Sequence, residues 1–129
     1  MDIQTTSRTE LIDITDRVRA AVKENGIKEG ICVISTRHTT AGIIINENER
    51  GLRKDILDML EVLVPENKNY VHNQIDNNAD AHLRAIIIGT SEVIPIDDGH
   101  LVLGTWQSIF FVELDGPRKR SFDVRIIGS

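Results

Sequence analysis

Three of the four histidines lie in short polar segments between apolar stretches, and they are the side chains best suited to chemistry. They are His38, His72 and His82. Neutral imidazole is a common metal ligand and changes its protonation near neutral pH. The separations of 34 and 10 residues match no standard zinc pattern. The alternative of three hydrogen-bonded histidines in polar loops therefore stays open.

Four carboxylates, Glu47, Asp76, Asp80 and Glu113, adjoin apolar segments. Of these we take Glu47, Asp80 and Glu113 as candidates for proton transfer. Partial burial would raise the pKa of such a group towards the range useful for acid and base catalysis. Glu113 is the strongest candidate because it ends the apolar run 109–112. The alternative, that each carboxylate is simply solvated, is also consistent with a chain of net charge -5.

Two arginines follow the turn at 115–117 and would lie on one face of an extended strand. Arg118 and Arg120 are suited to binding phosphate, because guanidinium groups match the geometry of its oxygens. Thr90 and Ser91 follow a glycine and would add hydroxyl and amide donors to an anion site. The alternative for the arginines is a basic strand edge that discourages aggregation.

The only tryptophan lies in a polar segment that contains Thr105, Trp106 and Gln107. Its ring could stack on a flat substrate, with hydrogen-bonding side chains on either side of it. A buried or subunit-contact tryptophan is the alternative, because aromatic side chains are common anchors at interfaces.

Composition predicts one domain over 1–129, since the chain has 129 residues of which 40% are hydrophobic. We find neither an apolar run of membrane-spanning length nor a signal-peptide pattern, so we expect a cytoplasmic protein that does not bind membranes. The single cysteine, Cys32, excludes an internal disulfide. The net charge of -5 opposes general binding to nucleic acids.

Hydrophobic periodicity predicts how these side chains are positioned. We expect a strand over 3–11 that extends to residue 14, and a helix from Thr15 to Asn25 that Gly26 ends. Two strands, 31–36 and 41–46, would place His38 at a strand end or in a hairpin, with Glu47 across it.

The second half is predicted to begin with helices and to end with strands. A helix capped by Asn48 should end at Pro65, and the asparagine-rich stretch 66–78 should form a functional loop that carries His72. A third helix over 80–88 would bury Leu83, Ile86 and Ile87. The late strands are expected at 92–96, 101–103, 105–114 and 120–127, as an antiparallel meander. The fold class is therefore α+β, with a largely antiparallel sheet and about three helices.

Seven motifs, taken in order and spacing, resemble the YjbQ-like family, also called the secondary thiamine-phosphate synthase family. The resemblance runs nearly end to end. The motifs are His38-Thr39-Thr40-Ala41, Asn46-Glu47-Asn48-Glu49, Tyr70-Val71-His72-Asn73, Asn78-Ala79-Asp80-Ala81-His82-Leu83, Gly89-Thr90-Ser91, Gly104-Thr105-Trp106-Gln107 and Glu113-Leu114-Asp115-Gly116-Pro117-Arg118.

The resemblance implies a compact subunit that assembles as a homotrimer, with polar pockets near the subunit boundaries. It also implies a divalent metal, zinc or magnesium, held by His38, His72 and His82. The implied activity joins an aminopyrimidine methyl diphosphate to a thiazole phosphate with loss of diphosphate, either as the main reaction or as a side activity.

We expect the protein to bind a small phosphorylated metabolite, and two other functions are consistent with such a ligand. The first is a metal-dependent hydrolase in which Glu47 or Glu113 acts as the base. The second is a trimeric protein that binds a metal or ligand without turnover. The usual enzyme of thiamine-phosphate synthesis resembles a TIM barrel, which 129 residues cannot form, so any shared activity would be convergent.

Overall fold

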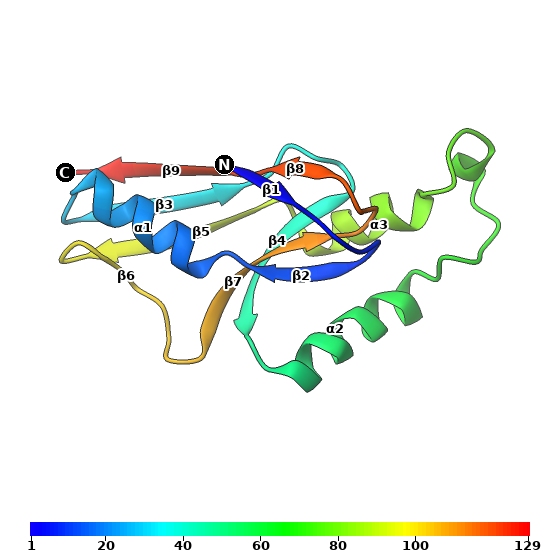
Figure 1. Ribbon diagram of the computed structural model, residues 1–129, viewed down its shortest axis with the longest axis horizontal. Coiled ribbons are helices and arrows are strands. Elements are labelled where there is room, and N and C mark those ends of the chain that lie inside the picture. Colours follow the sequence, from blue (N-terminus) through cyan, green and yellow to red (C-terminus); the bar gives the residue numbers. More distant parts are fainter.

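The computed structural model describes residues 1–129 as three helices and three small antiparallel sheets (Figure 1). The helices are α1 (Thr15–Asn25), α2 (Arg50–Leu63) and α3 (Ala79–Ile88), with a short 3-10 helix, η1 (Val71–Gln74). The strands are β1 (Asp2–Gln4), β2 (Glu10–Asp13), β3 (Gly30–Ser35), β4 (Ala41–Glu47), β5 (Ser91–Asp97), β6 (His100–Leu101), β7 (Gln107–Glu113), β8 (Lys119–Ser121) and β9 (Asp123–Gly128). The predicted α+β class is therefore confirmed.

The three sheets have the strand orders β1-β8, β2-β7-β4 and β6-β5-β3-β9. The predicted meander is wrong, because β7 leaves the strands that precede it and pairs with β2 and β4. The predicted single strand over 3–14 is also wrong. Its two parts, β1 and β2, pair with β8 and β7 in different sheets.

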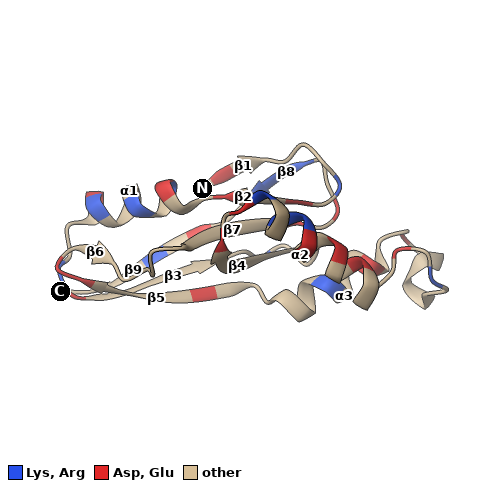
Figure 2. Ribbon diagram, turned by 90° about the horizontal axis from the view of Figure 1, so that it is seen from below, with Lys and Arg blue, Asp and Glu red and all other residues tan.

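Strand β7 is the centre of the molecule because it is buried on both faces. Ile109 and Phe111 join a core with α1, β3 and β5, whereas Phe110 and Val112 join a second core with α2 and α3. Alternation along a strand sends successive side chains to opposite faces, so a continuous apolar run marks a strand covered on both sides. The charged residues gather mainly on the helices and loops (Figure 2).

The helix ends follow from local chemistry. Gly26 adopts a left-handed conformation with φ of 82° and its N–H bonds to the carbonyl of Val22, which ends α1 as predicted. The cap of α2 is Glu49, one residue after the predicted Asn48, and its carboxylate accepts from the N–H groups of Gly51 and Leu52. No helix combines the length and apolar character needed to cross a membrane.

Helix α3 buries a different face from the predicted one. Ala81 and Ala85 lie in the core, whereas Ile86 and Ile87 are 77% and 55% exposed. Small side chains allow α3 to lie close to β4 and β7, so the larger apolar residues are left on the outside. The predicted inward positions of Leu83, Ile86 and Ile87 are therefore wrong.

Candidate functional site

His38 lies on the connection between β3 and β4. Of the two predicted positions, a strand end or a hairpin, the hairpin is wrong, because β3 and β4 belong to different sheets. The backbone N–H of Ser121 donates to Nε2 of His38 at 3.0 Å. An acceptor nitrogen carries no proton, so the ring proton of neutral His38 lies on Nδ1. Burial, and then the nearby charge of Arg120, lower the pKa of His38. His38 is thus a neutral hydrogen-bond donor at neutral pH.

His72 and His82 lie against each other, although they come from different helices. Their ring centroids are 4.8 Å apart and the rings are nearly perpendicular, at 74°. His72 projects from η1 and its Nε2 lies 2.9 Å from Oδ1 of Asn78. His82 lies in the first turn of α3, as predicted.

Two pockets share His82 as a wall, and we call them the polar pocket and the apolar pocket. The polar pocket has a volume of about 460 Å³ and is lined by Thr36, Arg37, His38, Thr39, His82, Ala85, Ile86 and Thr90. The apolar pocket has a volume of about 330 Å³ and is lined by Tyr70, Val71, His72, Ala79, His82 and Leu83. The fold therefore brings the three predicted histidines to two adjoining cavities.

Several imidazole nitrogens in these pockets are available to a ligand. Nδ1 of His38, Nδ1 of His72 and both nitrogens of His82 make no side-chain hydrogen bond. No buried side-chain nitrogen or oxygen lacks a partner, and the three histidines are only half-buried. These nitrogens therefore reach the solvent, where a bound molecule can contact them.

The histidines do not fit one metal ion as they are arranged in this chain. No group of three or more histidine, cysteine, aspartate or glutamate side chains has the geometry to hold a metal. The Nε2 atoms of His38 and His72 already have partners in Ser121 and Asn78. The chemistry proposed below accordingly uses the side chains alone.

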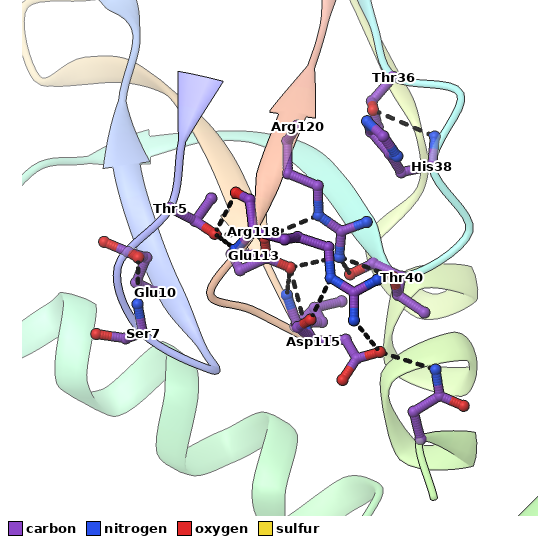
Figure 3. A network of polar contacts seen from close by, with 12 residues as sticks. Thr5, Ser7, Glu10, Thr36, His38, Thr40, Glu113, Asp115, Arg118 and Arg120 are labelled. Carbon is purple, nitrogen blue, oxygen red and sulfur yellow. Dashed lines mark hydrogen bonds and ion pairs between the residues drawn. The ribbon is translucent and has the colours of Figure 1, made fainter. Parts of the chain in front are cut away.

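Glu113 lies beside this region, in a buried ion pair with Arg120 (Figure 3). Nε of Arg120 donates to Oε2 of Glu113 at 2.8 Å, and Nη2 donates to Oε1 at 2.5 Å. Thr5 and the N–H groups of Leu114 and Asp115 complete the shell of the carboxylate. Gly116 is required nearby, because an added Cβ would lie 2.7 Å from Cγ of Glu113.

This shell keeps Glu113 ionised. Burial acts to raise the pKa of Glu113, but the hydrogen bonds from Arg120, Asp115 and Thr5 outweigh it and the net pKa is lowered. The predicted upward shift for a proton-transfer group is therefore wrong for Glu113. The ion pair of Glu113 with Arg120 connects the end of β7 to β8 and holds the two strands in position.

The predicted phosphate-binding residues have different surroundings. Arg120 is 5% exposed and also donates from Nη2 to Oγ1 of Thr40. Arg118 is exposed and donates to the carbonyl and the carboxylate of Asp115. Thr90 lines the polar pocket, whereas its neighbour Ser91 begins β5 and lines neither pocket.

Four other predicted site residues do not reach the histidines within one chain. Glu47 pairs with Gln107 at one end of the β4–β7 ladder, whereas Ala41 pairs with Glu113 at the other. Six residues along a strand span about 20 Å. Thr105 and Trp106 precede Gln107, and Trp106 is 72% exposed. These residues form a separate polar edge.

Asp80 is a buried ion-pair partner. Its carboxylate binds Nη1 of Arg8 at 3.0 Å and lies 3.5 Å from Nη1 of Arg84. Arg84 also binds the carbonyl of Val64, at the end of α2. Asp80 thus connects the N-terminal segment to α2 and α3, and its side chain is already committed to these contacts.

Sequence reasoning missed residues that surround the histidines. Asn78 bonds to both His72 and Asp115, and Arg37 lines the polar pocket next to His38. Both lie within motifs or beside them, so their polar side chains were visible in the sequence. Their partners were not visible, because Asp115 lies in the turn after β7 and Asp123, which pairs with Arg37, lies in β9.

Comparisons with known proteins agree over the full length. The family model described as "UPF0047 protein YjbQ-like" matches residues 1–129. The chain belongs to this YjbQ-like family. A UPF0047 protein of Methanothermobacter thermautotrophicus is 51% identical over 128 residues, which cover 99% of this chain and 90% of the relative. The UPF0047 protein YugU of Bacillus subtilis is 40% identical over 129 residues, which cover 99% and 97%.

Solved structures of similar proteins have the same fold. A YbjQ-like protein of unknown function from Sulfolobus solfataricus P2 aligns with a TM-score of 0.99 at 48% identity, over 100% of this chain and 94% of that chain. A hypothetical protein from Aeropyrum pernix K1 aligns with a TM-score of 0.97 at 40% identity, over 100% and 96%. Membership of the YjbQ-like family thus rests on both sequence and fold.

Proposed function

We propose that this YjbQ-like protein is a transferase of the thiamine-phosphate synthase type, acting at the polar and apolar pockets. The main support is that His82 lines two adjoining pockets. One pocket has cationic and hydroxyl groups, and the other has largely apolar walls. A phosphorylated substrate with a flat ring needs both kinds of surface, and needs them next to each other.

The reaction replaces a C–O bond with a C–N bond. The bond between the methylene carbon of the aminopyrimidine and the diphosphate oxygen breaks, and diphosphate leaves with the electron pair. The lone pair of the thiazole nitrogen forms the new bond to that carbon. The products are thiamine phosphate and diphosphate, and no proton is removed from either substrate.

The polar pocket supplies groups for the departing diphosphate. The guanidinium of Arg37 is positively charged, Nδ1–H of His38 is a hydrogen-bond donor, and Thr39 and Thr90 have hydroxyl groups. Donors that are fixed before the reaction stabilise developing negative charge at little cost in reorganisation. The fixed proton position on His38 makes it such a donor.

Neither of the two carboxylates predicted to act as a base is placed to activate water at the pockets, which favours group transfer over hydrolysis. A hydrolase of the type considered above needs Glu47 or Glu113 to activate water. Glu113 is enclosed by Arg120 and Thr5, and Glu47 lies at the opposite end of β4. The synthase reaction needs no such base.

The direct test supplies both substrates to the purified protein. We expect thiamine phosphate and diphosphate in equal amounts, measured by chromatography and a diphosphate assay, with no diphosphate released when the thiazole phosphate is left out. Release without the thiazole would indicate a hydrolase. If both substrates remain unchanged, the synthase and hydrolase hypotheses are both wrong, and a protein that binds a ligand without turnover is favoured.

We also propose that the active form is a homotrimer. Large apolar side chains are exposed on α2 and α3, among them Met59, Val62, Leu63, Ile86 and Ile87. Two of them, Met59 and Ile87, line a groove of about 350 Å³ along β4, which is an edge strand. Apolar surface of this kind is typical of subunit contacts. Light scattering should give three times the chain mass of 14.5 kDa, and a monomer would contradict the proposal.

A further inference from the structure

A chain of polar contacts runs from the turn between β7 and β8 to the apolar pocket and ends on His72. Nη2 of Arg118 binds Oδ2 of Asp115 at 3.1 Å, and Nδ2 of Asn78 donates to the same oxygen at 2.8 Å. Oδ1 of Asn78 then lies 2.9 Å from Nε2 of His72. Asn78 is only 7% exposed, so its amide has few other partners.

This chain determines which nitrogen of His72 carries the proton. An ionised carboxylate only accepts hydrogen bonds, so Asp115 requires the NH₂ group of Asn78 to face it. The amide oxygen must then face His72, and an oxygen accepts. Neutral His72 therefore donates from Nε2, and its Nδ1 holds a free lone pair.

That lone pair is available to a ligand. Nδ1 of His72 has no hydrogen-bond partner, and no buried side-chain nitrogen or oxygen in the chain is unpaired, so Nδ1 is accessible. His72 lines the apolar pocket with Tyr70, Val71 and Leu83. His82 also lines this pocket, but no hydrogen bond within the protein fixes the position of its proton. An acceptor fixed among largely apolar walls, such as Nδ1 of His72, favours flat rings that carry a hydrogen-bond donor.

We propose that Asn78 and Asp115 are positioning residues that hold His72 as a hydrogen-bond acceptor, and that the apolar pocket thereby selects a heterocycle with an amino or ring N–H donor. The inference deepens the proposed function, on which it rests for the identity of the ring, because an aminopyrimidine carries such an amino group. His38, whose Nε2 accepts from Ser121, is fixed in the opposite sense and donates in the polar pocket.

The proton position can be measured without any assay of activity. Long-range proton–nitrogen NMR spectra of the ¹⁵N-labelled protein at about pH 8, where neutral imidazole prevails, should place the proton of His72 on Nε2 and that of His38 on Nδ1. The signals are assigned by their loss in single histidine-to-phenylalanine variants. A proton on Nδ1 of His72 in the native protein overturns the proposal.

Asp115→Asn tests the role of the carboxylate. An amide at 115 can donate as well as accept, so it no longer dictates the orientation of Asn78, and His72 should become a mixture of the two neutral forms. Asp76→Asn is the matched control, because it removes one negative charge from the exposed loop beside His72. An unchanged His72 spectrum in folded Asp115→Asn contradicts the positioning role.

Ligand selection is tested with two rings of nearly equal shape, 4-amino-2-methylpyrimidine and 2,4-dimethylpyrimidine, titrated into the protein by NMR. One hydrogen bond predicts about tenfold weaker binding of the methyl analogue. The difference should disappear in His72→Phe. Equal binding to the native protein overturns the selection. If the amino ring is preferred but no thiamine phosphate forms, the proposed function fails and this inference stands.

Discussion

The Glu113–Arg120 network and the two histidine pockets lie side by side but use their polar groups differently. The carboxylate of Glu113 is 0% exposed, with Arg120, Thr5 and two backbone N–H groups as its partners. The histidines are half-buried and keep nitrogens without partners. Polar groups whose partners lie within the protein stabilise the fold, whereas groups open to solvent can bind a ligand. This difference indicates a structural role for the first region and supports the proposed ligand binding at the second.

The largest expected effect comes from breaking the buried pair. Arg120→Met leaves Glu113 as an uncompensated buried charge, which should lower the free energy of unfolding by about 3–5 kcal/mol in urea denaturation. Arg37→Met is the control, because the exposed pair of Arg37 with Asp123 at 3.4 Å should contribute about 0–1 kcal/mol. Equal losses in the two variants would remove the distinction between the regions.

His82→Phe should affect ligand binding and leave stability nearly unchanged. The ring lines both pockets and neither of its nitrogens has a partner in the fold. We expect a change in unfolding free energy within about 0.5 kcal/mol and a loss of synthase turnover of about 100-fold. Steady-state kinetics and thermal unfolding measure the two quantities. Full turnover in a folded variant would show that the reaction does not use the shared wall of the pockets.

The smallest expected effect is a pH dependence. Burial opposes ionisation of Glu113, but Arg120 and the other donors lower its folded-state pKa below the ordinary 4.5. The unfolded state therefore binds a proton first, so the stabilisation is complete above the unfolded pKa and is lost as pH falls through the folded pKa. The stability difference between the native protein and Glu113→Gln should shrink in acid, as measured by urea denaturation at a series of pH values. A constant difference would contradict this assignment.

The comparison also indicates which parts of the site could be predicted from the sequence. Histidines in polar segments were recognisable by residue type, and all three reach the pockets. The role of Glu113 was not recognisable, because the same apolar run that suggested a raised pKa continues into a turn where Arg120 folds back on it. Burial raises the pKa of a carboxyl group, whereas hydrogen-bond donors and cations lower it. The donors that meet Glu113, Arg120 and Thr5, are brought to it by the fold, and the sequence does not show these contacts.

Local signals determined much of the fold of this YjbQ-like protein. Apolar periodicity and Gly26 defined α1, and the β-branched runs around His38 became β3 and β4. These features depend on neighbours a few residues away, which the sequence displays directly.

Only the tertiary structure decided which strands pair and which nitrogens carry protons. Strands β3 and β4 are consecutive, yet they pair in different sheets, and this takes Glu47 away from His38. The proton positions of His38 and His72 depend on Ser121 and Asn78, and that of His72 further on Asp115. A hydrogen bond is set by the atoms that meet in space, and the sequence alone does not say which atoms will meet.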